Sequence, residues 1–163
     1  MLHASSTGPN PGRRKAGQSE EAKAHHSRNH TEFSSALTSE GAPNIIVVDD
    51  DREISALFTR ILKKAGCNVS KSFSRGKELL DYLEEEVNAS SPLPDVVLLD
   101  FRMPGLDGLE TAKRLRERYP KLKLVLISAY EPPGEGKGYF DAYLNKPVSI
   151  NELVNTVSVL LGK

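Results

Sequence analysis

Along most of the chain, blocks of apolar residues alternate with mixed apolar and polar blocks, a pattern that predicts strands and helices in turn. Continuous apolar runs, typical of strands buried on both faces, predict strands at residues 45–48, 95–99 and 124–127. A more polar stretch at 68–72 predicts an edge strand, and 142–144 predict a short fifth strand. Strands that alternate with helices in this way predict an α/β unit with a parallel sheet.

Apolar residues at three- and four-residue intervals predict the helices between these strands. In the first helix Gly66 marks the end, and the apolar stripe consists of Ile54, Leu57, Phe58, Ile61, Leu62 and Ala65. In the second helix we expect Ser74 at the N-cap, and the stripe consists of Leu79, Leu80, Leu83 and Val87.

Two capping-box pairs, in which a side chain caps the helix and a glutamate follows three residues later, predict the starts of two more helices. Asp107 with Glu110 opens a helix that runs to about residue 119, and Ser149 with Glu152 opens the last one. Asp51 precedes the first helix, and we interpret it mainly as that helix's cap rather than as a site residue.

The connection between the fourth and fifth strands is too rich in helix breakers for a full helix. Lys146 follows Ser128 by only 18 positions, and the segment between them contains Pro132, Pro133, Gly134, Gly136 and Gly138. We therefore expect the fourth helix of the pattern to be reduced to a loop, or to a single turn around residues 139–140.

Right-handed crossovers and helices on both faces predict a doubly wound, flavodoxin-like sheet of five parallel strands in the order 2-1-3-4-5. In this order the first and third strands are neighbours. Asp49 and Asp50 follow the first strand and Asp100 ends the third, so the three carboxylates are expected at the carboxyl edge of the sheet, where α/β folds place ligands.

Carboxylates gathered in this way require compensation. Two of them 4 Å apart repel by roughly 4 kcal/mol at an effective dielectric near 20. A cation or a proton has to offset this repulsion, so the cluster predicts a metal site, a shifted pKa or both. Oxygen ligands favour a hard divalent cation, and Mg²⁺ is the cofactor we expect.

Two further strand ends supply groups to the same edge, a hydroxyl from Ser128 and an ammonium from Lys146. Three carboxylates, a hydroxyl and an ammonium suit phosphoryl transfer, which depends on in-line positioning and charge neutralisation. In this interpretation Asp100 is the nucleophile and forms an aspartyl phosphate.

Four short motifs lie at the ends of predicted strands, in residues 47–50, 99–108, 127–129 and 143–147. They read Val-Val-Asp-Asp, Leu-Asp-Phe-Arg-Met-Pro-Gly-Leu-Asp-Gly, Ile-Ser-Ala and Tyr-Leu-Asn-Lys-Pro. With these motifs in this order, residues 45–163 resemble the receiver domain of two-component response regulators. The resemblance implies that Asp100 is the phosphoacceptor. It also implies that Asp50 binds Mg²⁺ directly, Asp49 largely through water, and Arg102 through its backbone carbonyl.

The resemblance assigns the remaining motif residues as well. Lys146 would pair with the phosphoryl group, and the Lys146–Pro147 peptide is often cis in this family. Ser128 would bond a phosphoryl oxygen and shift on activation. Tyr143 occupies the position of the family's switch aromatic, although a half-buried edge aromatic would give the same pattern.

Two departures from the family lead to further expectations. The shortened fourth helix belongs to the face that reads out phosphorylation in receivers, so we expect a mobile or remodelled output surface. In receivers the positions two after the phosphoacceptor and two after the hydroxyl influence phosphoryl hydrolysis. They are Arg102 and Tyr130 here, and a bulky Tyr130 predicts a comparatively long-lived aspartyl phosphate.

Composition restricts the partners and the cellular compartment that we expect for this protein. Net charge is zero, which argues against a nucleic-acid partner, and a single cysteine, Cys67, rules out an intrachain disulfide. No apolar run has transmembrane length and no secretory signal is evident, so we expect a cytoplasmic protein without a membrane partner. Residues 1–44 hold all four histidines and few large apolar residues, which predicts a disordered tail before a receiver domain at 45–163.

The favoured function is a stand-alone, phosphorylation-dependent signalling switch, monomeric or weakly dimeric, rather than a turnover enzyme. Its expected partners are a sensor histidine kinase or phosphotransfer protein and a downstream protein target that the sequence does not identify. One alternative is an interaction module whose acidic pocket binds metal but is never phosphorylated. A weaker one is a phosphatase that passes phosphate through Asp100 to water, but Arg102 stands where a second catalytic carboxylate would be expected.

Overall fold

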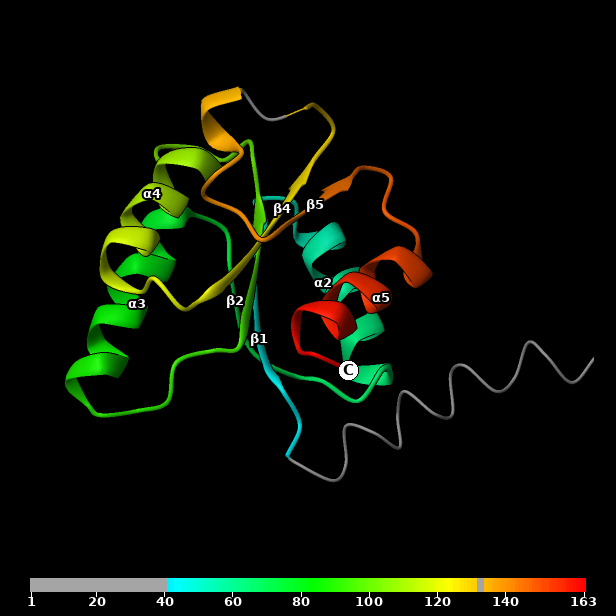
Figure 1. Ribbon diagram of the computed structural model, residues 1–163, viewed down its shortest axis with the longest axis horizontal. Coiled ribbons are helices and arrows are strands. Elements are labelled where there is room, and N and C mark those ends of the chain that lie inside the picture. Colours follow the sequence, from blue (N-terminus) through cyan, green and yellow to red (C-terminus); the bar gives the residue numbers. More distant parts are fainter. Residues whose placement is uncertain (1–40, 132–133) are drawn as a thin grey trace, which may run out of the picture.

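The computed structural model describes residues 41–131 and 134–163, whose centre is a parallel five-stranded sheet (Figure 1). The strands are β1 (Asn44–Val48), β2 (Asn68–Phe73), β3 (Val96–Asp100), β4 (Lys123–Ser128) and β5 (Ala142–Asn145). Their order is β2-β1-β3-β4-β5, and every neighbouring pair is parallel. The predicted flavodoxin-like fold and strand order are confirmed. The tail predicted at 1–44, with its histidines, lies almost wholly outside the described residues.

In the part of the chain that the structure describes, four α-helices cover the two faces of the sheet: α2 (Arg52–Lys64), α3 (Gly76–Asn88), α4 (Gly108–Arg118) and α5 (Ile150–Leu160). The helices α2 and α5 lie on one face, and α3 and α4 lie on the other (Figure 1). Within the described residues, no helix combines the length and the apolar character needed to cross a membrane.

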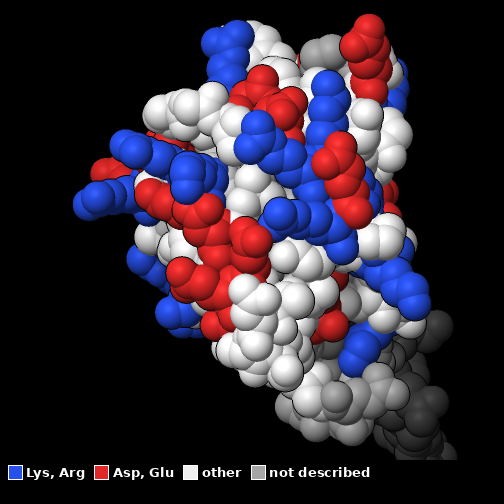
Figure 2. Space-filling view, turned by 90° about the vertical axis from the view of Figure 1, so that its left-hand side faces the viewer, with Lys and Arg blue, Asp and Glu red and all other residues white. Residues whose placement is uncertain are grey.

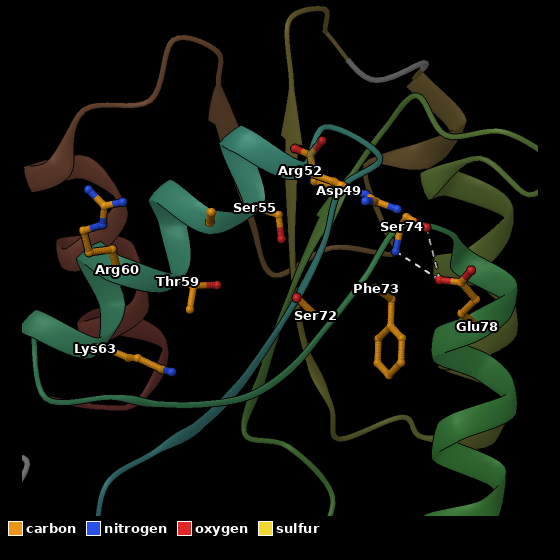
Figure 3. Close-up of a pocket in the computed structure, with 11 residues that line it drawn as sticks. Asp49, Arg52, Ser55, Thr59, Arg60, Lys63, Ser72, Phe73, Ser74 and Glu78 are labelled. Atoms are coloured by element: carbon orange, nitrogen blue, oxygen red, sulfur yellow. Dashed lines mark hydrogen bonds between the residues drawn. The ribbon is translucent and has the colours of Figure 1, made fainter.

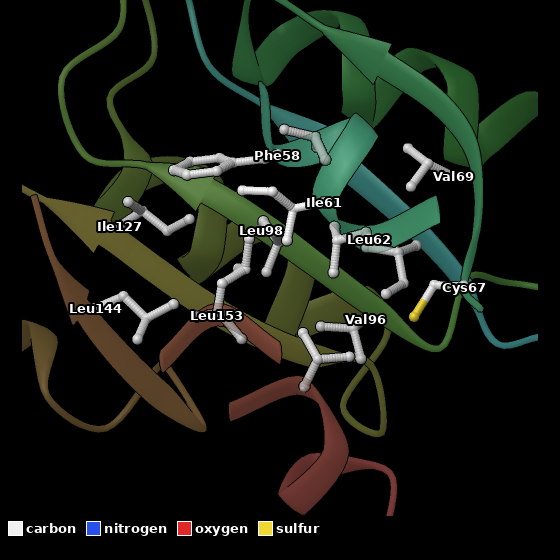
Figure 4. Packing of buried hydrophobic residues seen from close by; sticks show 14 residues of the cluster. Phe58, Ile61, Leu62, Cys67, Val69, Val96, Leu98, Ile127, Leu144 and Leu153 are labelled. Carbon is white, nitrogen blue, oxygen red and sulfur yellow. The ribbon is translucent and has the colours of Figure 1, made fainter. Parts of the chain in front are cut away.

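The sheet separates two hydrophobic clusters. Phe58 of α2 and Leu153 of α5 pack with Leu98 in the first cluster (Figure 4). Leu99, the next residue of β3, belongs to the second cluster with α3 and α4. Successive strand residues point to opposite faces, so a strand covered on both sides has to be apolar throughout. This is why the continuous run of β3 was a reliable strand signal.

Side chains predicted to cap helices do so at three of the four α-helices. Asp51 accepts hydrogen bonds from the backbone N–H groups of Glu53 (2.9 Å) and Ile54 (3.2 Å) at the start of α2. Asp107 accepts one from Glu110 (2.8 Å) at the start of α4. At the start of α5, Ser149 and Glu152 form a full capping box.

The cap predicted for α3 is wrong. Arg75 stands at the N-cap and makes no side-chain capping bond. The backbone N–H and hydroxyl of Ser74 instead donate to Glu78 Oε2 (3.1 and 3.3 Å). The helix starts at Gly76, where the chain packs so closely on α4 that a Cβ would collide with the Thr111 side chain. The start of α3 therefore coincides with a tertiary contact to α4, which the local sequence does not encode.

Two residues of the predicted apolar stripes are exposed. Leu57 is 49% exposed and Val87 is 45% exposed. Leu57 lies about 100° around α2 from its neighbour Phe58, which occupies the middle of the buried stripe. Val87 lies in the last turn of α3. Both positions fit a helical period but fall at the margins of the contact with the sheet.

The connection between β4 and β5 is short, as predicted. In its described part, 129–131 and 134–141, the helical structure is one 3₁₀ turn, η1 (Gly134–Gly136). The turn lies before residues 139–140 rather than around them. Gly136 is buried against α4, where a Cβ would come within 3.1 Å of Leu109 Cδ1. Phe140 is buried in the cluster on the α3–α4 face and covers the sheet there.

An ionic clamp consisting of Arg116 and Asp141 holds the end of this connection at the amino edge of the sheet. Arg116 of α4 pairs with Asp141 (2.6 Å) and donates to the carbonyls of Tyr139 (2.8 Å) and Leu122 (2.7 Å). Asp141 also accepts from the backbone N–H of Leu124 (2.8 Å). Burial, which raises the pKa of Asp141, is outweighed by these donors and by the cations, so the pKa lies below its ordinary value.

Candidate functional site

The predicted site residues gather in a hollow of about 500 Å³ at the carboxyl edge of the sheet. Val48 and Leu99 are register partners in β1 and β3, so Asp49 and Asp100, the residues after them, lie at the carboxyl ends of neighbouring strands. The hollow is lined by every predicted site residue except Tyr143, that is, by Asp49, Asp50, Asp100, Arg102, Ser128 and Lys146.

Lys146 connects two of the carboxylates directly. Its Nζ donates to Asp49 Oδ2 (2.9 Å) and to Asp100 Oδ1 (2.8 Å). Strand pairing places it there, because Ser128 and Asn145 are register partners and the Lys146 backbone N–H donates to the Ser128 carbonyl (2.8 Å). The Lys146–Pro147 peptide is cis, as the resemblance implied. The direct bridge from Lys146 to Asp49 was not foreseen from the sequence.

Burial sets the electrostatics of the bridge. The Asp100 side chain is buried, and burial raises its pKa above the ordinary value. The hydrogen bond and charge of Lys146 lower that pKa, the charges of Asp49 and Asp50 raise it, and the net direction is upward. For Lys146, burial lowers the pKa, but the two carboxylates outweigh it and the pKa is raised. The Lys146 ammonium therefore keeps its proton, whereas the negative charge of Asp100 is only partly offset.

The donor set of the hollow fits a hard divalent cation. Asp49, Asp50 and Asp100 each offer a carboxylate oxygen, and these three oxygens lie within 4.8 Å of one another. Two of the side chains are buried and Asp50 is exposed, which leaves an approach from solvent. Three carboxylates facing one ammonium leave a net negative charge, and oxygen ligands are those that Mg²⁺ prefers.

Asp51 has two contacts that position this donor set. Its side chain caps α2, and its backbone N–H donates to Asp49 Oδ1 (2.9 Å). Asp49 is thus fixed from both sides, by Lys146 at one oxygen and by the first turn of α2 at the other. The position of Asp51 before a helix predicted the capping contact of its side chain, but nothing in the sequence indicated the contact of its backbone N–H with Asp49.

The Ser128 hydroxyl lies buried at the end of β4 and accepts a hydrogen bond from the backbone N–H of Tyr130 (3.0 Å). Tyr130 itself is 55% exposed, and the Arg102 guanidinium lies over its ring at 4.3 Å from the centroid. The two residues expected to flank a phosphoryl group therefore contact each other at the wall of the hollow. A cation over an aromatic face is an attractive pair.

Tyr143 lies outside this hollow, on the edge strand β5. Its hydroxyl donates to the carbonyl of Lys137 (2.6 Å), and its ring meets Phe140 edge-on at 5.7 Å between centroids. It is 37% exposed. This position fits both a half-buried edge aromatic and a switch residue, and the hydroxyl links Tyr143 to the shortened connection.

Comparisons with known proteins agree with this geometry. The family model described as "Response regulator receiver domain" matches residues 45–158. The "DNA-binding transcriptional regulator NtrC" of Escherichia coli (strain K12) is 38% identical over 116 residues, which are 68% of this chain and 23% of that protein. The "Response regulator MprA" of Mycolicibacterium vanbaalenii is 36% identical over 123 residues, 73% of this chain and 50% of that protein. The chain thus spans half or less of the length of these relatives.

A solved structure shows the same fold. It is described as a "putative response regulator from Chloroflexus aurantiacus J-10-fl", with a TM-score of 0.65 and 26% identity. The match covers 76% of this chain and 100% of that one.

Proposed function

The chain belongs to the response regulator receiver family, and from this premise we propose that it is a phosphorylation-dependent signalling switch. A sensor histidine kinase or a phosphotransfer protein would donate a phosphoryl group from phosphohistidine to Asp100. The modified protein would act by contact with a downstream protein or by passing the group on in a phosphorelay. The observation that carries this proposal is the shared ammonium of Lys146 between two buried carboxylates, with a third carboxylate at the opening.

In the proposed step, an Asp100 carboxylate oxygen attacks phosphorus in line with the histidine nitrogen. An O–P bond forms, the N–P bond breaks, and the nitrogen leaves with the bonding electron pair. Lys146 already bonds Asp100 Oδ1 and is placed to pair with the incoming phosphoryl oxygens. Asp49, Asp50, Asp100 and the Arg102 backbone carbonyl would hold Mg²⁺, which supplies charge neutralisation to the phosphoryl oxygens.

Ser128 and Tyr143 are the proposed switch residues. The Ser128 hydroxyl accepts from the Tyr130 backbone N–H, and its own O–H would donate to a phosphoryl oxygen, so that phosphorylation would draw the end of β4 toward the modified Asp100. The Tyr143 hydroxyl is hydrogen-bonded to the β4–β5 connection, so a movement of the ring would displace that connection. The output surface of this protein would then be the short connection itself. Amide exchange in its residues as slow as in the strands would contradict this role.

Tyr130 and Arg102 would slow hydrolysis of the aspartyl phosphate. Their stacked pair lies at the wall of the hollow and would hinder an attacking water. The replacement Tyr130→Ala removes both the ring and the support for the guanidinium. We expect it to speed autodephosphorylation about tenfold, which corresponds to about 1.4 kcal/mol in the barrier. An unchanged rate would count against the shielding role.

Mass spectrometry of the intact protein after incubation with acetyl phosphate and Mg²⁺ tests the central claim. We expect one phosphoryl group on the wild type, none on Asp100→Asn, and an undiminished signal on Asp81→Asn, the matched control. Asp81 is an exposed carboxylate on α3 that pairs with Lys77. A wild type that never takes up phosphate under these conditions would favour the alternative function, an interaction module whose acidic pocket binds only metal.

A further inference from the structure

A second hollow of about 660 Å³ lies between α2 and the edge strand β2, next to the start of α3 (Figure 3). Of the residues that line it, only Asp49 also lines the hollow of the proposed phosphorylation site. We call it the α2–β2 groove. Apart from Asp49, the residues that line it have no part in the proposed function.

Side chains of α2 form one wall of the groove. Arg52, Ser55, Thr59 and Lys63 recur at three- and four-residue intervals, which places them on one side of the helix. Ser55, Thr59 and Lys63 point toward β2, where Ser72 faces them (Figure 3). Over the described residues, the hydroxyls of Ser55, Thr59 and Ser72 make no hydrogen bond to the protein, so they are available as donors.

The cations that line the groove have no counter-ion among residues 41–131 and 134–163. Arg52, Arg60 and Lys63 all line it and are exposed, and in the described part of the chain none of them forms an ion pair. The opposite face of the molecule differs, because acidic and basic side chains lie close together over α3 and α4 (Figure 2). The pairs there are Lys77–Asp81, Arg114–Glu110 and Arg118–Glu84.

The acidic residues that line the groove are already bonded within the protein. Asp49 accepts from Lys146 and from the Asp51 backbone N–H. Glu78 accepts from the backbone N–H and the hydroxyl of Ser74. Neither carboxylate bonds a cation of the groove, so the lining has more hydrogen-bond donors than acceptors to pair with them.

We propose that the α2–β2 groove binds an acidic segment of a partner protein. Carboxylate side chains match both kinds of donor, guanidinium or ammonium and hydroxyl. Length favours a segment over a single small anion: Arg52 and Lys63 are eleven positions apart on α2, which is about 16 Å at 1.5 Å per residue. An extended segment of about five residues spans that distance, whereas one phosphate ion does not.

The test is fluorescence anisotropy with a labelled oligoglutamate peptide at physiological ionic strength, with oligoglutamine as the neutral control. The variant Arg52→Gln/Arg60→Gln/Lys63→Gln is compared with the matched variant Lys77→Gln/Arg114→Gln/Arg118→Gln, which removes the same charge from the α3–α4 face. We expect the groove variant to weaken binding about tenfold or more and the control variant less than about twofold.

Equal weakening by both variants, or no binding by the wild type, would overturn the proposal. Inorganic phosphate that displaced the peptide at equal concentration would also overturn it, because the groove would then be a small-anion site. Amide chemical-shift mapping on the unmodified protein needs no variant. Shifts confined to residues 52–63 and 72–78 support the proposal, and shifts spread over α3 and α4 contradict it. None of these measurements involves phosphate transfer, so their failure leaves the proposed function standing.

Discussion

Asp100 and Asp141 are both partly enclosed carboxylates with a cation close by, yet their pKa values are displaced in opposite directions. Asp100 ends β3 at the carboxyl edge, and its pKa is raised by burial together with the charges of Asp49 and Asp50. Asp141 precedes β5 at the amino edge, and its pKa is lowered, because the Leu124 N–H, Arg116 and Lys123 outweigh burial. At one edge two carboxylates share the Lys146 ammonium and a third, Asp50, lies beside them, whereas at the other edge a single carboxylate has two cations and an N–H.

The ratio of donors to carboxylates therefore distinguishes the two regions. At the amino edge the donors are enough to compensate the carboxylate, and the Arg116–Asp141 ion pair links α4 to the β4–β5 connection. Where carboxylates are in excess, the fold retains an unfavourable charge that a cation, and in our proposal a phosphoryl group with its metal, would compensate. The Arg116–Asp141 pair thus has a structural role in the fold, whereas the excess of carboxylates at the carboxyl edge supports our proposal of a functional site.

The largest expected effect is the loss of the clamp. Asp141→Ala leaves the Arg116 guanidinium without its carboxylate and the Leu124 N–H without an acceptor. We expect the free energy of unfolding to fall by about 3 kcal/mol. Urea denaturation measures this change. Asp81→Ala, which removes an exposed pair of α3, is the control, and we expect it to cost about 0.3 kcal/mol. Equal losses in the two variants would show that the clamp stabilises the fold no more than an exposed ion pair does.

The same clamp should depend on pH with a defined sign. The pKa of Asp141 is lower in the folded protein than its ordinary value of 3.8. The unfolded chain therefore takes up a proton at this group first as the pH falls. The stabilisation is complete above 3.8 and is lost as the pH falls through the lower folded-state pKa. The stability difference between wild type and Asp141→Asn should shrink over that range, and a difference that grew would contradict the assignment.

Next in size is the removal of the shared ammonium. Lys146→Met leaves the buried carboxylates of Asp49 and Asp100 facing each other without a cation. We expect a loss of about 2 kcal/mol in the free energy of unfolding in a metal-free buffer. Saturating Mg²⁺ should recover part of it, because the metal would take over the compensation. Lys77→Met, at an exposed i,i+4 pair, serves as the control. Mg²⁺ that failed to stabilise either protein would refute the metal site.

The opposite sign is expected at Asp100. Asp100→Asn removes one of the excess charges while Lys146 keeps its bond to Asp49. Thermal unfolding without metal should show a gain of about 1 kcal/mol. A destabilised Asp100→Asn protein would mean that the two edges are held in the same way, and the comparison between them would fail.

The smallest effect concerns the connection itself. Tyr143→Phe removes the hydroxyl that donates to the Lys137 carbonyl and leaves the ring against Phe140. We expect a cost of about 0.5 kcal/mol, together with faster amide exchange in residues 134–141 and unchanged exchange in β3. Hydrogen exchange read by mass spectrometry resolves the two segments. Equal exchange in wild type and variant would show that the hydroxyl does not hold the connection.

Much of the fold and of the candidate site could be predicted because local patterns encode it. Continuous apolar runs marked β1, β3 and β4, and the strand order followed from crossover rules, which brought Asp49 and Asp100 to one edge. Side-chain caps such as Asp51 act on N–H groups two or three residues away, so they are visible in the sequence. The cap at Ser74 failed where close packing between α3 and α4 accompanies the start of the helix.

The sequence by itself thus determined the strands, their order and the chemical groups that meet at the carboxyl edge, because periodicity and short-range capping are local properties. Only the tertiary structure decided how the charges are shared: that Lys146 bridges Asp49 and Asp100, that Arg116 and Asp141 close the β4–β5 connection, and that the cations of the α2–β2 groove stay unpaired within the described residues. Ion pairs between distant residues depend on distances of a few ångströms that only packing sets, and no local pattern records those distances.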